Sequence, residues 1–149
     1  MQLKEAICSI LNEQLTAKIC TANQSIDSAK EARDNETKSS AGDKYETGRE
    51  MMQFELDKQN GQLHQLTLLQ GELSKVNLQT TYTQAAFGSL IITNQGNYFL
   101  SVSLGKVVIE TEDYYALSLV SPLGKMLLGK SVGDSFVFQG KEFAVLDIY

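Results

Sequence analysis

The chain has 149 residues, of which 42% are hydrophobic and 21% are charged. This length is enough for one ordinary domain or two small ones with a modest core, and it argues against a large enzyme. The 13 Lys and Arg side chains against 18 Asp and Glu give a net charge of −5. An acidic chain is a poor ligand for nucleic-acid phosphates, so we exclude free DNA or RNA as the primary partner.

Two cysteines, Cys8 and Cys20, lie on one predicted helix. Twelve positions along a helix place their side chains roughly 120° apart, so we expect neither a disulfide between them nor a metal site. No stretch approaches the roughly 18 consecutive apolar residues that a membrane-spanning helix needs. We therefore predict a cytoplasmic protein without membrane contact.

The first part of the chain carries a helical repeat. Apolar residues advance in steps of three or four without an interrupting proline: Leu3, Ile7, Leu11, Leu15, Ile19, Ala22, Ile26 and Ala29. The repeat predicts an amphipathic helix from about Gln2 to Arg33, roughly 48 Å long at 1.5 Å per residue. A helix of this length needs a partner that covers its apolar stripe.

The stripe stops at residues 34–42, where polar and turn-forming residues cluster, and we predict a hairpin tip there. From Asp43 a heptad pattern resumes, and its apolar positions are Met52, Leu56, Leu63, Leu66 and Leu73. The two patterns predict a pair of antiparallel helices with facing apolar stripes. Each glycine in the second helix costs roughly 1 kcal/mol relative to Ala, so we expect close helix approach or bending at Gly48, Gly61 and Gly71.

The composition changes after residue 78. Residues 79–86 are polar, β-branched and short of charge, and we interpret them as a linker. Six short segments with strand character follow, separated by glycine-containing turns: 89–93, 98–104, 106–111, 114–120, 135–138 and 142–148. The chain is therefore predicted to be α+β. An antiparallel coiled-coil helical hairpin occupies residues 1–78, and a small antiparallel sheet domain with one short helix occupies residues 87–149.

The short helix is predicted inside the sheet domain. Ser121 is a suitable N-cap, Pro122 fits the first helical position, and Gly129 suits the left-handed conformation that ends many helices. Three apolar side chains of this helix are expected to be buried: Met126, Leu127 and Leu128.

Residues 121–134, with the sequence SPLGKMLLGKSVGD, resemble the C-terminal domain of the Gre transcript-cleavage factors of bacterial RNA polymerase. The family motifs EAR and Y-x-x-x-R-E are matched around the predicted tip by Glu31-Ala32-Arg33 and by Tyr45 with Arg49-Glu50. The resemblance covers nearly the whole chain and implies a diverged member of the family. It also implies an FKBP-like fold for the sheet domain.

In the Gre family, the globular domain docks at the mouth of the polymerase secondary channel and the hairpin tip reaches toward the active site. Two acidic side chains at the tip help to hold a second Mg²⁺, so that the polymerase hydrolyses backtracked RNA. The resemblance therefore implies a transcription elongation regulator that is an accessory factor and not an enzyme. Its implied partner is RNA polymerase, with a contact to the 3′ end of the nascent RNA. It implies no intrinsic cofactor, with Mg²⁺ only as an ion shared with the polymerase active site.

The tip departs from the family pattern. In one alignment, the two acidic positions of the family fall on Lys38 and Ala41. In the other, they fall on Thr37 and Ser40. Neither alignment places an acid there, and a hard cation prefers anionic oxygen ligands. We therefore predict that this chain stimulates little or no RNA cleavage.

Other tip residues remain candidates for function. Glu36 and Asp43 are the reserve candidates for metal-binding acids, although Asp43 is equally suited as the N-cap of the second helix. The remaining tip candidates for contact with polymerase or RNA are Asp34, Lys38, Ser39, Ser40, Lys44, Tyr45 and Arg49.

The resemblance assigns polymerase binding to one loop of the sheet domain, with the residues Ser121, Pro122, Leu123 and Lys125. The family often carries an acid directly before this Ser-Pro pair, whereas this chain has Val120. The substitution weakens a charged contact or replaces it with an apolar one.

Two alternative functions remain open. In the first, the chain is a coiled-coil interaction or chaperone-like protein that reuses the Gre scaffold. In the second, its FKBP-like domain is a weak prolyl isomerase. An isomerase needs an aromatic-lined pocket, and this sequence contains no Trp. Affinity for core RNA polymerase distinguishes the leading hypothesis from both alternatives.

Overall fold

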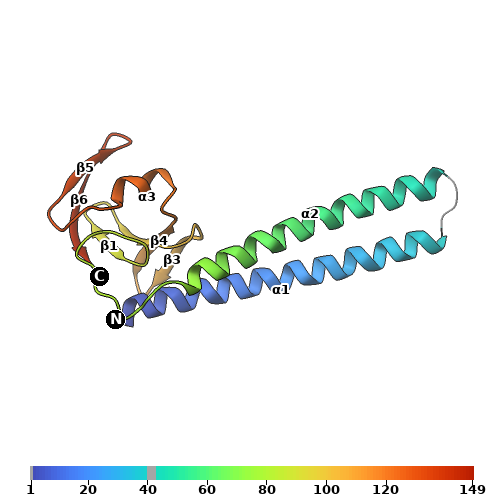
Figure 1. Cartoon of the computed structure of the whole chain (residues 1–149), viewed down its shortest axis with the longest axis horizontal. Coiled ribbons are helices and arrows are strands. Elements are labelled where there is room, and N and C mark those ends of the chain that lie inside the picture. The colour runs from blue at the N-terminus through green and yellow to red at the C-terminus, as the bar shows by residue number, and fades with distance from the viewer. Residues whose placement is uncertain (1, 40–42) are drawn as a thin grey trace. The chain divides into compact units, whose positions relative to one another are not determined.

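The computed structural model describes residues 2–39 and 43–149, and for residues 36–39 and 43–46 it describes the backbone alone (Figure 1). The chain divides into two compact units. One unit consists of residues 13–70, and the other consists of residues 1–12 together with residues 71–149. The order of elements confirms the predicted α+β class, with two long helices followed by a sheet that carries one short helix.

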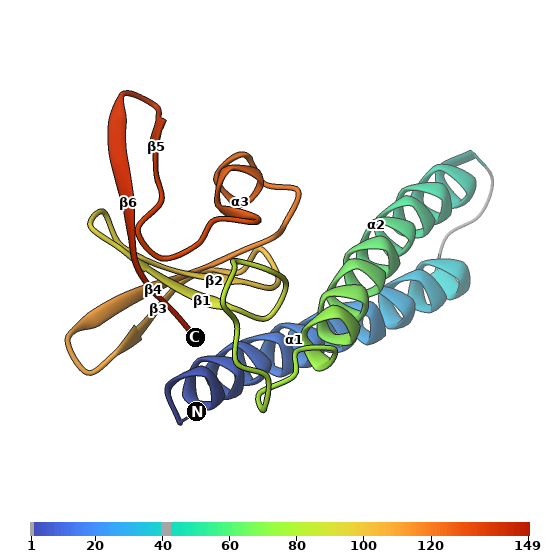
Figure 2. The ribbon, with the colours of Figure 1, turned by 60° about the vertical axis from the view of Figure 1, so that its left-hand side comes forward.

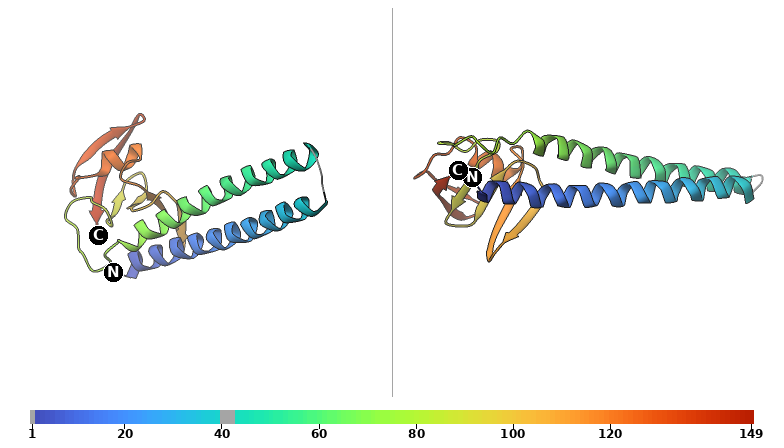
Figure 3. Two further views of the ribbon diagram at one scale, coloured as in Figure 1. Left: turned by 45° about the vertical axis from the view of Figure 1, so that its right-hand side comes forward. Right: turned by 90° about the horizontal axis from the view of Figure 1, so that it is seen from below.

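Two helices, α1 (Gln2–Ser39) and α2 (Asp43–Ser74), run antiparallel as the predicted hairpin (Figure 3). The expected tip at residues 34–42 is wrong in its first part, because α1 continues through residue 39. No glycine or proline precedes Gly42 in this segment, so its polar residues can extend the backbone hydrogen bonds of the helix. At 38 residues, α1 corresponds to about 57 Å, longer than the sequence pattern predicted.

The apolar stripes of both helices are partly buried in the unit of residues 13–70. Its buried apolar side chains are Leu15, Ala22, Ile26 and Leu56. Five predicted stripe residues of this unit are only half-buried: Ile19, Ala29, Met52, Leu63 and Leu66. A two-helix hairpin covers each stripe from one side alone, so side chains at the flank of a stripe keep part of their surface in water.

Close approach of the helices does not explain two glycines of α2, Gly61 and Gly71. A Cβ atom built on Gly61 or Gly71 would meet no heavy atom within 4 Å. The expectation of close packing is therefore wrong for these two positions, and nothing in the structure explains their glycines.

The sheet has six strands in the order β3-β4-β2-β1-β6-β5 (Figure 2). Their bounds are β1 (Leu90–Thr93), β2 (Asn97–Leu100), β3 (Gly105–Ile109), β4 (Glu112–Leu117), β5 (Ser135–Phe138) and β6 (Lys141–Ile148). All neighbours pair antiparallel except β2 and β4, so the expected purely antiparallel sheet is wrong for this pair. After β2 the chain forms β3 at the edge of the sheet. It then forms β4, which lies between β3 and β2, antiparallel to β3 and parallel to β2.

Both faces of the sheet are buried over its central strands. One face and α3 (Pro122–Leu127) share a core cluster that includes Ile91, Leu100, Leu127, Phe143 and Val145. The rings of Phe136 and Phe143 stack in this cluster with their centroids 5.1 Å apart. Side chains alternate between the faces of a strand, and the intervening residues on the other face are also buried: Leu90, Phe99, Val107, Tyr114 and Ala116.

Residues 79–86, which we predicted as a linker, contain no helix or strand. Ala85 is nevertheless buried in the core cluster. Its N–H donates to the Lys130 carbonyl at 2.8 Å, and its carbonyl accepts from the Gly129 N–H at 2.8 Å. This segment is therefore fixed against the chain that follows α3.

Lys4, in the first turn of α1, is buried and contacts the same segment and the residues that follow it. Its ammonium donates to the carbonyls of Thr80 and Gly88, at 3.2 Å each, and lies 4.8 Å from the centroid of the Tyr82 ring. Loss of hydration on burial lowers the pKa of this ammonium. The two carbonyls and the aromatic face replace the hydration that the ammonium has lost.

Replacing Leu56 by Ala should lower the free energy of unfolding by about 2–4 kcal/mol, because it leaves a cavity at a buried position of the hairpin. Leu68→Ala, at an exposed position of the same helix, should change it by less than about 1 kcal/mol. Urea denaturation followed by circular dichroism measures both values. Equal losses would contradict the assignment of the buried stripe.

Cys8 should resist alkylation in the folded chain. Burial raises the pKa of its thiol to about 11, and the thiolate is the species that reacts. At about pH 8, iodoacetamide should label the exposed Cys20 and leave Cys8 unmodified, whereas in urea both cysteines should react. Peptide mass spectrometry locates the label, and rapid labelling of Cys8 in the native chain would contradict the raised pKa of its thiol.

Candidate functional site

The segment that resembles the Gre docking loop forms a tight corner at the start of α3. The Ser121 hydroxyl oxygen accepts a hydrogen bond from the Gly124 N–H at 3.1 Å and donates one to the Ser118 carbonyl at 2.7 Å. Pro122 occupies the start of the helix, where its missing N–H has no consequence. The predicted roles of Ser121 as N-cap and Pro122 as first helical residue are confirmed.

Gly124 makes this corner possible. It is buried, and a Cβ atom at this position would overlap the Ser118 carbonyl oxygen and the Ser121 hydroxyl. Only a residue without a side chain allows the helix to pass this close to the preceding chain. The corner is therefore held by side-chain hydrogen bonds and by steric fit.

The four residues predicted to bind polymerase have different environments in the corner. Pro122 and Lys125 are exposed, whereas Ser121 is half-buried because it caps the helix. Leu123 packs against the core cluster of the sheet domain. The corner thus leaves Pro122 and Lys125 exposed, whereas Ser121 caps the helix and Leu123 contacts the core cluster.

Two exposed apolar side chains flank the corner. Leu128, which we expected to be buried, is 47% exposed, and that expectation is wrong. Leu127 takes the core position, and the next residue turns away from the core, before Gly129 ends the segment at a φ of +83°. Val120, directly before the cap, is 76% exposed. Pro122 and Lys125 lie three positions apart and are therefore neighbours on the helix surface, a spacing that sequence reasoning did not interpret.

Near the predicted hairpin tip, Arg33 bonds across the two helices. Its Nη1 donates to Oε1 of Gln53 at 3.2 Å, and its Nε lies 3.5 Å from Oδ1 of Asp34. Asp34 therefore lies on α1 in an exposed ion pair and not on a turn. Arg49 lies on α2 with an exposed side chain.

The structure describes the other tip candidates only in part. Ser40 and Ala41 lie outside the described residues. The backbone is described as helical, but the side chains are not, for Glu36, Thr37, Lys38, Ser39, Asp43, Lys44 and Tyr45. Among the described residues, no group of three or more His, Cys, Asp or Glu side chains is arranged to hold a metal ion.

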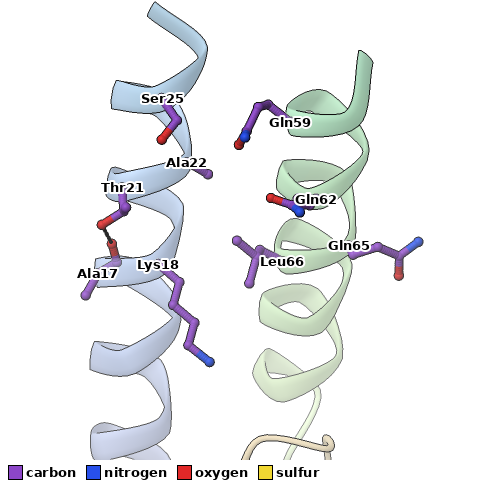
Figure 4. Close-up of a pocket in the computed structure, with 9 residues that line it drawn as sticks. All are labelled: Ala17, Lys18, Thr21, Ala22, Ser25, Gln59, Gln62, Gln65 and Leu66. Carbon is purple, nitrogen blue, oxygen red and sulfur yellow. Dashed lines mark hydrogen bonds between the residues drawn. The ribbon is translucent and has the colours of Figure 1, made fainter. Parts of the chain in front are cut away.

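A groove of about 680 Å³ lies between α1 and α2, midway along the hairpin (Figure 4). Small side chains of α1 form one wall, including Ala17, Thr21 and Ser25, and Thr21 donates to the Ala17 carbonyl at 3.1 Å. On the other wall, Gln59, Gln62 and Leu66 of α2 point toward α1. The sequence signal for this groove was the four-residue spacing of small residues on α1, which we did not interpret.

No protein-family model matches this chain, and comparison with curated proteins gives no significant match. Among the helices that the structure describes, none is both long and apolar enough to cross a bilayer.

Alanine substitution should have opposite effects on the free energy of unfolding at two glycines, Gly124 in the corner and Gly61 in α2. Gly124→Ala should lower the free energy of unfolding by roughly 1–3 kcal/mol, because the new methyl group overlaps the Ser118 carbonyl oxygen. Gly61→Ala, in open space within α2, should raise it by up to about 1 kcal/mol through helix propensity. Thermal unfolding of both variants measures the effects, and a neutral Gly124→Ala would show that the corner is not tight.

Proposed function

We propose that this protein is a Gre-like transcription elongation regulator that binds RNA polymerase at its secondary channel. The sheet domain docks through the corner at the start of α3, and the hairpin directs its tip toward the polymerase active site. The protein acts as an accessory factor without an active site of its own.

The observation that carries this proposal is the corner itself. The residues that resemble the Gre docking loop form a rigid turn that exposes Pro122 and Lys125. This turn lies in a sheet domain that follows an antiparallel helical hairpin, which is the order of domains in the Gre family. A preformed turn supports binding because little conformational entropy is lost on association.

We further propose that the bound protein stimulates little or no RNA cleavage and competes with true cleavage factors. The family positions for metal-binding acids hold Lys38 and Ala41 in one alignment, and Thr37 and Ser40 in the other. Neutral or cationic side chains cannot supply the carboxylate oxygens that stabilise a second Mg²⁺. Asp34, the acid nearest to these positions in sequence whose side chain the structure describes, already pairs with Arg33.

A second candidate function is that of a coiled-coil interaction protein whose hairpin binds a different partner. Two large apolar side chains of α2 favour it, because Met51 is 66% exposed and Phe54 is 74% exposed. They lie three residues apart and hence on one side of the helix. Binding to core RNA polymerase, or its absence, separates the two functions.

The test uses the full-length chain with its cognate core RNA polymerase and a backtracked elongation complex. We expect the chain to bind the polymerase, to leave the backtracked RNA largely uncleaved, and to reduce the cleavage stimulated by an authentic Gre factor. Gel analysis of labelled RNA measures cleavage, and competition is measured by titration of the chain against the Gre factor.

Two carboxamide variants, Glu36→Gln and Asp43→Asn, serve as controls for the reserve acids. If the unmodified chain stimulates cleavage strongly and either variant abolishes it, the chain is a working cleavage factor with relocated acids. Absence of polymerase binding would instead contradict the proposed function and favour the second candidate.

A further inference from the structure

An exposed stripe runs along α2 on the side away from α1. Phe54 is 74% exposed and Leu68 is 49% exposed, and Gly61 lies midway between them in sequence. Seven positions fall about 20° short of two full helical turns, so these three residues lie within about 40° of one another around the helix. We call Phe54, Gly61 and Leu68 the outer stripe.

The side chain of Gln65 locates this side of the helix. Gln65 follows Gly61 by four positions and precedes Leu68 by three, so it is a neighbour of both on the helix surface. In Figure 4 the side chain of Gln65 points away from α1, whereas Gln62 and Leu66 point toward it. The outer stripe therefore lies opposite the seam of the hairpin.

Gly61 is the residue of the stripe that a single chain does not explain. Glycine is among the least favourable residues inside a helix. Gly61 is exposed, and a Cβ atom built on it would meet no heavy atom within 4 Å. A glycine does, however, let another backbone approach closely, because it has no side chain. A second helix that crosses α2 at Gly61 would account for this glycine.

The outer stripe is symmetric in sequence about Gly61. Phe54 precedes Gly61 by seven positions, and Leu68 follows it by seven. If two copies of α2 cross antiparallel about a two-fold axis at Gly61, Phe54 of each copy comes level with Leu68 of the other. The stripe is thus complementary to itself, as a two-fold interface between identical subunits requires. A helix of an unrelated partner requires no such symmetry, so the spacing favours a second copy of this chain as the occupant.

The polar residues beside the stripe fit the same arrangement. Asp57 and His64 are exposed on one flank, four positions before Gly61 and three after it. The two-fold axis therefore brings Asp57 of one copy nearly level with His64 of the other, and a carboxylate accepts a hydrogen bond from an imidazole N–H. On the other flank, Lys58 comes level with Gln65 of the second copy. Neither flank places two like charges together between Phe54 and Leu68.

Like charges limit the length of the contact. The same axis brings Glu50 of one copy level with Glu72 of the other, and each lies eleven positions, or about 16 Å along the helix, from Gly61. Helices that cross at an angle diverge away from the crossing point, which separates these acids. Glu72 also pairs within its own chain, since its Oε1 lies 2.8 Å from the Lys75 Nζ. The contact is therefore confined to the middle of α2.

We propose that this protein self-associates through the outer stripe, with two copies of α2 crossing antiparallel at Gly61. The interface has two identical apolar contacts, each between Phe54 of one copy and Leu68 of the other. A contact of this size forms a weak dimer whose population depends on concentration. The inference goes beyond the proposed function and does not depend on it, because it concerns a face of the hairpin and requires no polymerase.

Sedimentation velocity of the full-length chain measures the association. The sedimentation coefficient should rise from the monomer toward the dimer value between about 5 and 500 μM protein. Phe54→Ala and Leu68→Ala should each weaken association by at least about tenfold, because each removes two apolar contacts from a symmetric dimer. Val137→Ala is the matched control, because Val137 is 65% exposed on β5 and should not affect association.

Gly61→Gln tests the close crossing and separates association from folding. The added side chain should weaken association by holding the two helices apart, yet glutamine favours the helix more than glycine does. At a low concentration, where the chain is monomeric, the variant should therefore unfold at a higher temperature than the unmodified chain. Asn60→Gln, at the exposed neighbouring position, should leave association unchanged, because this side chain is turned about 100° from the direction of Gly61.

Cysteine cross-linking tests the two-fold axis. In a Cys20→Ser background, Gly61→Cys should form a disulfide-linked dimer under mild oxidation, because the axis places residue 61 of both copies face to face. Asn60→Cys in the same background should cross-link far less. Both variants retain Cys8, so its contribution is the same in each, and non-reducing gels measure the dimer.

Each outcome decides the inference. A chain that sediments as a monomer over the whole concentration range overturns it and leaves the outer stripe to a partner of another kind. Association that neither Phe54→Ala nor Leu68→Ala weakens also overturns it, since the contact then lies elsewhere. Equal cross-linking of the two cysteine variants contradicts the axis at Gly61. Weaker association of both alanine variants, together with selective cross-linking through residue 61, supports it.

Discussion

The sheet domain depends on one close contact, where α3 passes against the carbonyl oxygen of Ser118. The Ser121 hydroxyl joins this carbonyl to the Gly124 N–H, and the missing side chain of Gly124 leaves room for the approach. The contact sets the direction in which α3 leaves β4. It thereby brings Leu127 into the core cluster and turns Lys125 outward. The same contact therefore shapes both the core and the proposed docking surface.

The first turn of α1 belongs to the same compact unit as the sheet, and a buried ammonium contributes to holding them together beside the buried Ile7 and Leu11. Lys4 satisfies the carbonyls of Thr80 and Gly88, which precede β1. A hydrophobic residue at this position would leave both carbonyls without that donor, and an unpaired carbonyl at the buried Gly88 is costly. A polar contact thus performs a structural role that a hydrophobic pattern cannot reveal.

The hairpin between residues 13 and 70 is stabilised less completely than the sheet domain. Its stripe leaves Leu63 and Leu66 half-buried, and small side chains of α1 line a groove beside them. Two helices alone cannot enclose their apolar surface as a sheet covered on both faces can. A partner that covers this surface would therefore gain free energy from the hairpin itself.

Periodicity in the sequence determined the two antiparallel helices and the six strand segments, because both depend on the local alternation of apolar and polar residues. It also determined the cap at Ser121 and Pro122, whose signals lie within a few neighbouring residues. The tertiary structure alone decided the parallel pairing of β2 with β4, since pairing joins segments that are distant in sequence. It also decided the burial of Lys4 and the exposure of Leu128, because burial depends on which distant segments cover a side chain.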